Sequence, residues 1–245
     1  MCTVTYLPVP NGYLLTSNRD EAFVRKPAVY PNTNGHLLFP RDGDGGGTWI
    51  ATSDNNRTVC LLNGAFYQHK HQPPYRKSRG LVVLDFFNST SVAAFVKTYK
   101  LLDIEPFTML IIEDKKLYDF RWDGSQKYLK ELDAGQPNMH CSVTLYTPKV
   151  IALRQKWFAD WLKEQGEYSV KEILKFHLFA GENDTSTNIR MSRMGLVKTV
   201  SITCVEGRNK LQKMYYSDLQ GDNNFYFSEH GFETTEIKES ISFIK

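Results

Sequence analysis

The stretch MCTVTYLPVPNGYLLTSNRDE, residues 1–21, sets the start of the fold. Side chains along residues 2–7 alternate in polarity until the pattern breaks at Pro8, which is typical of a strand. Pro10, Asn11 and Gly12 form a turn signal, and residues 13–17 return as the second strand of a hairpin. In such a hairpin residue 17 lies near residue 2. The tetrapeptide Asn-Arg-Asp-Glu at 18–21 is therefore expected beside Cys2.

Cys2 directly follows Met1, and this position permits nucleophilic chemistry. If Met1 is removed, a thiol with a reference pKa of about 8.5 and an α-amine of about 7.7–8.0 share one residue. The amine can then accept the thiol proton without a histidine. Arg19 would stabilise the thiolate and Asp20 would orient the amine. A charged turn with solvated side chains fits the same spacing, and spacing alone does not choose between these interpretations.

The remaining chain predicts an α+β protein of antiparallel strands with two inserted groups of helices. Helical spacing covers residues 78–87 and 89–102, with Ser89 as the expected cap of the second helix. Pro148 begins a strongly amphipathic helix that ends at Gly166, and a further helix covers 169–179. Strands are predicted at 37–39, 48–52, 58–62, 107–112, 116–122, 142–145, 198–205, 210–216 and 223–228.

Composition restricts the class of protein. The 245 residues are 41% hydrophobic and 13% aromatic, enough for a large core, and we expect one domain over 1–245. The net charge of +3 is scattered, which argues against nucleic-acid binding. No apolar run is long enough to span a membrane, and the first residues do not resemble a secretory signal, so we expect a cytoplasmic protein.

The four cysteines are widely separated and form no CxxC pair, which argues against a disulfide framework and a structural zinc site. Cys60 and Cys204 lie in strand-like runs and are expected to pack as small core residues.

Five short motifs follow one another in the first third of the chain: Met1-Cys2-Thr3, Asn18-Arg19-Asp20-Glu21, Gly46-Gly47-Thr48-Trp49-Ile50-Ala51, Leu62-Asn63-Gly64, and Ser78-Arg79-Gly80 before an apolar helix. In this order they resemble the NRDE family, also called the transport and Golgi organisation 2 family. The resemblance is dense over residues 1–85 and looser beyond. That family is in turn similar to N-terminal nucleophile (Ntn) hydrolases of the choloylglycine hydrolase and penicillin V acylase type.

The resemblance implies an αββα sandwich of two stacked antiparallel sheets flanked by helices. It also implies residue roles: Cys2 matches the nucleophile and Arg19 the arginine after the first hairpin. Asp20 is the candidate for the aspartate that binds the α-amine, and Asn63 matches an asparagine of the oxyanion hole.

The sequence departs from those acylases at three places. Their arginine and aspartate are two residues apart, whereas Arg19 and Asp20 adjoin. The region 141–144 lacks the second functional asparagine. A late arginine of the acylase site corresponds to either Arg190 or Arg193, and the sequence does not choose between them.

Two polar loops raise other possibilities. The glycine-rich residues 43–48 lack the GxxxxGK[ST] pattern of a phosphate loop and are expected to enter a strand and rim the pocket. His69 and His71 share a face on an extended backbone, but no third metal ligand has suitable spacing. We expect their loop, 68–76, to cover the pocket, and we expect no metal and no cofactor.

Two functions follow from this reading. The first is an amidohydrolase that cleaves a non-peptide C–N bond of a small acyl substrate, with Cys2 freed by removal of Met1. The alternative is a non-catalytic carrier of haem or an acyl-lipid, in which a histidine or cysteine would be the axial ligand of a non-covalent haem. Both bind a small acyl-amide or lipid-like ligand, and the sequence indicates no oligomeric state.

Overall fold

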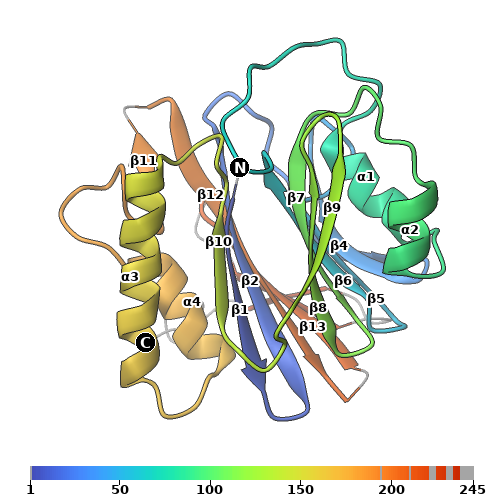
Figure 1. The fold of residues 1–245 in the computed structure, drawn as a ribbon. Helices are drawn as coiled ribbons and strands as arrows, with labels where there is room; N and C mark the ends of the chain where they lie inside the picture. Colours follow the sequence, from blue (N-terminus) through green and yellow to red (C-terminus); the bar gives the residue numbers. More distant parts are fainter. Residues whose placement is uncertain (1, 194, 210, 221–224, 230–233, 238–245) are drawn as a thin grey trace.

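Two antiparallel sheets stack face to face, and helices cover both outer faces (Figure 1). The computed structural model describes residues 2–193, 195–209, 211–220, 225–229 and 234–237. The first sheet has the order β10 (Asn138–Cys141), β1 (Cys2–Val9), β2 (Gly12–Ala22), β12 (Val197–Arg208), β13 (Leu211–Asp218), β14 (Phe225–Glu229), β15 (Thr235–Ile237), with β11 (Ser192–Arg193) paired to β12. The second sheet has the order β3 (Val29–Asn34), β4 (Leu37–Arg41), β5 (Ile50–Ser53), β6 (Thr58–Asn63), β7 (Phe107–Glu113), β8 (Lys116–Trp122), β9 (Lys127–Leu132).

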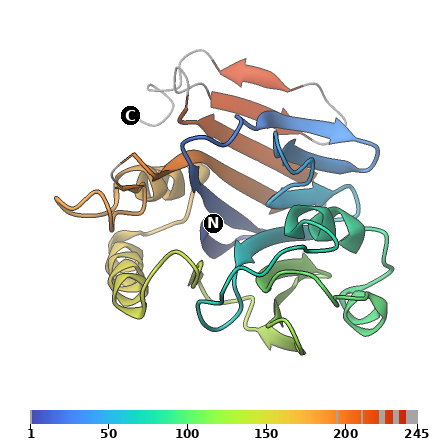
Figure 2. The same cartoon turned by 90° about the horizontal axis from the view of Figure 1, so that it is seen from above.

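The four helices of the described chain form the outer layers. Helices α1 (Arg79–Phe86) and α2 (Val92–Thr98) lie over the second sheet, and α3 (Pro148–Glu164) and α4 (Val170–Phe179) over the first. Seen from above, the start of β1 lies centrally, with the two helix pairs on opposite sides (Figure 2). This is the expected α+β sandwich of αββα layers.

Three apolar clusters fill the three interfaces between the layers. Val4 and Leu15 pack between the two sheets, whereas Leu7 and Leu14 pack on the opposite face against α3 and α4. Alternation along β1 and β2 thus buries both faces of these strands. Cys60 and Cys204 are fully buried in two different clusters, as predicted.

The N-terminal hairpin forms as expected, but Ser17 pairs with Val4 and not with residue 2, because β2 continues through the 18–21 tetrapeptide to Ala22. Its pairs run from Cys2 with Arg19 to Val9 with Gly12, and Asn11 takes the left-handed conformation (φ 59°) that the tight turn requires. Strand β2 also pairs with β12 on its other edge, so it lies in the interior of the first sheet.

Helix boundaries are confirmed for α3 and α4 and corrected for α2. The hydroxyls of Thr147 and Ser169 cap α3 and α4. Helix α2 begins at Val92 with Ser91 as its cap, not Ser89, because the Ser89 amide instead donates to the Phe86 carbonyl in the turn that ends α1.

Residues 142–145 form a turn instead of the predicted strand. The amides of Leu145 and Tyr146 donate to the Ser142 carbonyl, and the paired strand is β10, which ends at Cys141. The two last predicted strands begin at Leu211 and Phe225, so residue 210 and residues 223–224 of those predictions lie outside the described part.

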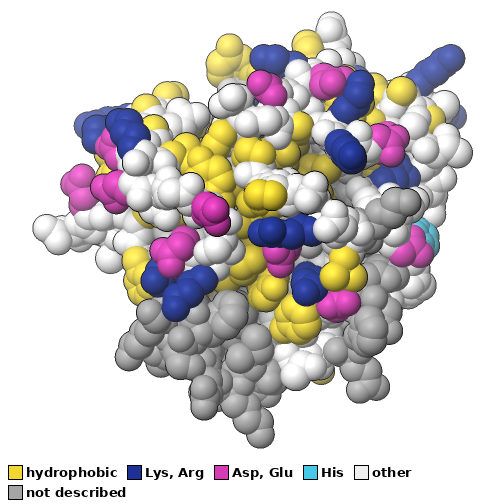
Figure 3. Space-filling model, turned by 90° about the horizontal axis from the view of Figure 1, so that it is seen from below, with side chains coloured by type: hydrophobic (Ala, Val, Ile, Leu, Met, Phe, Trp, Pro, Cys, Tyr) yellow, Lys and Arg dark blue, Asp and Glu magenta, His cyan; other side chains and the backbone are white. Residues whose placement is uncertain are grey.

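The surface seen from below mixes basic and acidic side chains around a central apolar area (Figure 3). Within the described residues, no helix is long and apolar enough to cross a membrane. That one domain spans residues 1–245 stays a prediction.

Candidate active site

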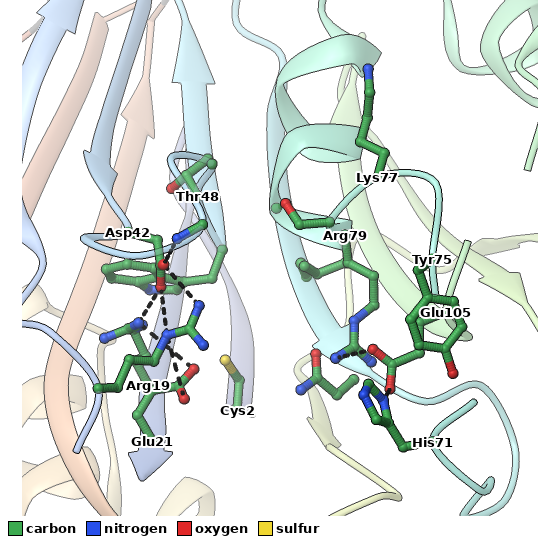
Figure 4. A pocket seen from close by; sticks show the side chains of 18 residues that line it. Cys2, Arg19, Glu21, Asp42, Thr48, His71, Tyr75, Lys77, Arg79 and Glu105 are labelled. Atoms are coloured by element: carbon green, nitrogen blue, oxygen red, sulfur yellow. Dashed lines mark hydrogen bonds and ion pairs between the residues drawn. The ribbon is translucent and has the colours of Figure 1, made fainter. Parts of the chain in front are cut away.

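A cavity of about 520 Å³ lies between the sheets beside Cys2 (Figure 4). Its walls come from the ends of β1, β2 and β6, from two loops and from Glu105. The first loop supplies residues of the 42–49 segment, and the second supplies residues of the 71–80 segment. The glycine-rich loop therefore rims the cavity, as expected, and the histidine-containing loop lines it too.

Cys2 and Arg19 are direct partners across the hairpin, so their side chains share one face of the sheet. Both line the cavity, and Cys2 is 2% exposed. Burial raises the pKa of the Cys2 thiol, the charges of Asp20 and Glu21 raise it further, and the Ser17 hydroxyl opposes them. The thiol therefore needs a nearby base to ionise at neutral pH. Met1 lies outside the described residues, and its removal stays a prediction.

Arg19 is held by Asp42, which sequence reasoning did not single out. One guanidinium nitrogen, Nη2, donates to Asp42 Oδ2 and lies 3.7 Å from Glu21, and the guanidinium stacks 4.5 Å from the centre of the Trp49 ring. Asp42 Oδ1 also accepts from Arg25 Nη2 at 2.8 Å. The Asp42 carboxylate thus forms ion pairs with two arginines.

Asp42 is ionised under all ordinary conditions. Burial alone would raise its pKa, but hydrogen bonds from Arg25 and the Gly45 amide, with the charge of Arg19, lower the pKa to about 2. An acidic residue at the start of a glycine-rich loop was the available signal, because free amides of such a loop commonly bind a carboxylate.

Asp20 lies on the opposite face of β2 and does not line the cavity. Tyr146 Oη donates to one carboxylate oxygen at 2.5 Å and Thr199 Oγ1 to the other at 2.7 Å. Burial raises the pKa of Asp20, while the Arg154 charge and both hydroxyls oppose the rise. Asp20 immediately follows the partner of Cys2, so an interaction with an amine at residue 2 remains a prediction.

Asn63 lines the cavity at the end of β6, as predicted. Ser142 joins this strand to β1: its amide donates to the Cys2 carbonyl at 2.9 Å, and its hydroxyl donates to the Asn63 carbonyl at 2.7 Å. Gly64 (φ 83°) allows this approach, because a Cβ there would lie 2.6 Å from Val143. The 141–144 region thus supports the site without an asparagine.

Glu105 and Arg79 form a second charged group on the cavity wall, which sequence reasoning also missed. Arg79 Nη2 lies 2.9 Å from Glu105 Oε2, and His69 and His71 each lie 3.1 Å from Oε1. Burial would raise the pKa of Glu105, but the Arg79 charge and the two histidines lower it. No group of three His, Cys, Asp or Glu suited to a metal occurs in the described part of the chain.

Neither late arginine reaches the cavity. Arg190 is exposed, and Arg193 Nη1 donates to the Leu145 carbonyl at 3.0 Å.

Known structures are similar in fold. Two structures of conjugated bile acid hydrolase from Clostridium perfringens, the C2A mutant and an arginine-to-leucine variant, have a TM-score of 0.57, cover 97% of both chains, and are 12% and 11% identical. An N-acylethanolamine-hydrolyzing acid amidase orthologue from Caenorhabditis elegans has a TM-score of 0.45 and 13% identity, with 83% of this chain and 92% of that chain covered. No curated protein matches the sequence significantly. At these identities the likeness establishes the Ntn-hydrolase-like fold alone. The model of the Transport and Golgi organisation 2 family matches residues 1–220, and the chain therefore belongs to that family.

Proposed function

We propose that the protein is an Ntn-type amidohydrolase that cleaves a non-peptide C–N bond of a small acyl substrate in the cytosol. The observation that carries this proposal is the Cys2 thiol on a cavity wall, in register with Arg19 and opposite Asn63 on the other sheet. The bile acid hydrolase that shares the fold is by its name an enzyme that hydrolyses a conjugate, which agrees with the proposal.

The reaction begins after Met1 is removed. The α-amine of Cys2 accepts the thiol proton, and the thiolate attacks the substrate carbonyl to form a tetrahedral oxyanion. The side-chain amide of Asn63 and a backbone N–H donate to this oxygen, each donor contributing about 3–4 kcal/mol in comparable sites. The C–N bond then breaks, and the leaving amine takes the proton from the α-ammonium group.

Water completes the reaction. The α-amine removes a proton from the water as the hydroxyl attacks the thioester carbonyl. Collapse of the second tetrahedral intermediate releases the carboxylic acid and restores the thiol. Asp20, whose carboxylate is held by its hydrogen-bond partners, orients the α-amine. Arg19 stabilises negative charge on Cys2 during the attack.

Intact mass spectrometry with an acylating probe tests the proposal. We expect the purified protein to lack Met1 and to gain one acyl group on residue 2. Cys2→Ala should abolish this labelling, whereas the buried Cys204→Ala variant should retain it. Labelling of Cys2→Ala at the same rate, or a labelled residue other than Cys2, would remove Cys2 from the mechanism.

The non-catalytic carrier remains a second interpretation with a distinct signature. It predicts that Met1 is retained and that the protein binds haem or an acyl-lipid without turnover. The charged lining described above does not favour such a ligand. An apolar ligand would remove water from the ion pairs and would offer no polar groups in its place. A haem absorption band that persists in Cys2→Ala, together with absent acylation, would establish the carrier.

A further inference from the structure

The cavity walls contain charged side chains on both sides. Arg19, Glu21 and Asp42 lie on one side of the space, and Arg79 and Glu105 lie across from them (Figure 4). Apart from Tyr75, the large apolar side chains among the described lining residues are Leu61 and Trp49, and the Arg19 guanidinium covers the Trp49 ring. A long aliphatic or steroid acyl group would therefore meet few apolar contacts and would desolvate the ion pairs.

The acceptor atoms of the two principal carboxylates are already occupied. Asp42 Oδ1 accepts from Arg25 and from the amides of Asp44 and Gly45, while Oδ2 accepts from Arg19 and Arg25. Both oxygens of Glu105 also have partners, namely Arg79 at one oxygen and two histidines at the other. A cationic ligand would have to displace these donors.

The two arginines of the cavity walls, by contrast, keep donors for a ligand. Within the described residues, Arg19 forms its hydrogen bond through Nη2, leaving Nε and Nη1 for a ligand. Arg79 uses Nη1 on the Pro106 carbonyl and Nη2 on Glu105, which leaves its Nε. The first turn of α1 adds to this wall, because Ser78 lines the cavity and its side chain makes no capping bond. A ligand that supplies acceptor oxygens complements both walls.

We propose that the substrate is a short-chain amide whose acyl group ends in a carboxylate, bound by Arg79 while the amide carbonyl lies at Cys2. This inference rests on the proposed function and names its substrate class. Arg79 lies on the wall opposite Cys2, so an acyl group bonded to the sulfur extends toward it (Figure 4). A guanidinium N–H forms a charge-assisted hydrogen bond with a carboxylate, and Nε is the Arg79 donor left for this end of the substrate.

Two 4-nitroanilides of equal chain length, succinyl and butanoyl, test the substrate class. Rates measured with the Cys2→Ala protein are subtracted, because the succinyl compound can react by itself. We expect kcat/KM for the succinyl substrate to exceed that of the butanoyl substrate by about tenfold, the size of one charge-assisted contact. Equal or faster cleavage of the butanoyl substrate overturns the proposal while leaving the amidohydrolase intact.

Two variants with opposite expected effects separate recognition from structural damage. Arg79→Met should reduce the succinyl-to-butanoyl ratio to near one, because the donor to the carboxylate is lost. Glu105→Gln should increase the ratio, because it removes the competing carboxylate from Arg79. The exposed Arg190→Met serves as the matched control with an unchanged ratio. A ratio that Arg79→Met leaves unchanged contradicts the proposal.

If neither anilide is cleaved, binding affinities measured by calorimetry on the Cys2→Ala protein test the ligand class. Succinamate should bind at least about tenfold more tightly than butanamide, and Arg79→Met should abolish the difference. Cleavage of neither anilide together with this preference refutes the hydrolase and retains the acidic ligand. Absence of the preference refutes the ligand class.

Discussion

The two faces of β2 use one tetrapeptide for two purposes. Arg19 and Glu21 face the cavity between the sheets, whereas Asn18 and Asp20 face helices α3 and α4. On the cavity face, Arg19 keeps donors available for a ligand. On the helix face, polar groups bind fixed partners in a dry interface. Strand alternation thus directs adjacent residues of one tetrapeptide to a cavity and to a buried interface.

Buried polar residues from the helices complete the second face. Arg154 is fully buried and donates to Thr3 Oγ1 and the Thr187 carbonyl, and its guanidinium lies 3.7 Å from the centre of the Tyr146 ring. His177, also fully buried, lies 2.7 Å from Thr5 Oγ1 through Nε2. These contacts fix α3 and α4 against the first sheet directly behind the candidate active site.

Arg154→Met should have the largest effect on stability. The change leaves two backbone carbonyls and the Thr3 hydroxyl without their donor and removes the cation nearest Asp20. We expect a loss of about 3 kcal/mol in the free energy of unfolding, measured by urea denaturation. Lys156→Met, on an exposed position of the same helix, is the control. A loss below about 1 kcal/mol for Arg154→Met would show that the helix face is not a structural unit.

The free energy of unfolding at acidic pH should also depend on the helix face of the first sheet, through His177. Asn18 Oδ1 can only accept, so Nδ1 of His177 carries the proton and Nε2 accepts from Thr5. Burial and then the Arg154 charge lower the pKa of His177 to about 3. The unfolded chain, with a pKa near 6.5, therefore binds more protons between these values, and stability falls as pH falls from about 6.5 toward 3.

The expected loss attributable to His177 is about 2–3 kcal/mol at pH 4.5 relative to neutral pH. His177→Gln should flatten this part of the profile, since other titrating carboxylates are common to both proteins. Unfolding measured at several pH values gives the difference directly. Identical pH profiles for the two proteins would contradict neutral, buried His177.

Short sequence patterns predicted the N-terminal hairpin and the helices over the first sheet. The turn signal at residues 10–12 and the alternation of residues 2–7 predicted the hairpin and placed the 18–21 tetrapeptide beside Cys2, but the pairing of Cys2 with Arg19 itself was not predicted. Pro148, the amphipathic pattern after it and Gly166 predicted α3, and a helix was also predicted over residues 169–179, where α4 lies. Strand β9 escaped prediction because it is a largely exposed, polar edge strand without alternation.

The missed site residues depend on tertiary contacts. Asp42 directly follows β4 and Arg79 begins α1, and both line the cavity beside Cys2, so no spacing in the sequence relates them to it. Arg154, which the sequence analysis did not single out, donates to the carbonyls of Thr187 and Asn188. Pairings over such distances need the folded chain.

Arg19→Met should change stability least and reactivity most, which is the opposite of Arg154→Met. Asp42 would keep Arg25 and two backbone amides, so no carboxylate is left unpaired, and we expect about 1 kcal/mol of destabilisation. If Arg19 stabilises the Cys2 thiolate as proposed, the rate of Cys2 acylation should nevertheless fall by about tenfold or more in this variant. Mass spectrometry of samples quenched at set times measures this rate at several pH values. The midpoint of the rise of the acylation rate with pH should move to higher pH in the variant. If Arg19→Met instead unfolds the protein as strongly as Arg154→Met and leaves the acylation profile of the folded fraction unchanged, then both faces of β2 are structural.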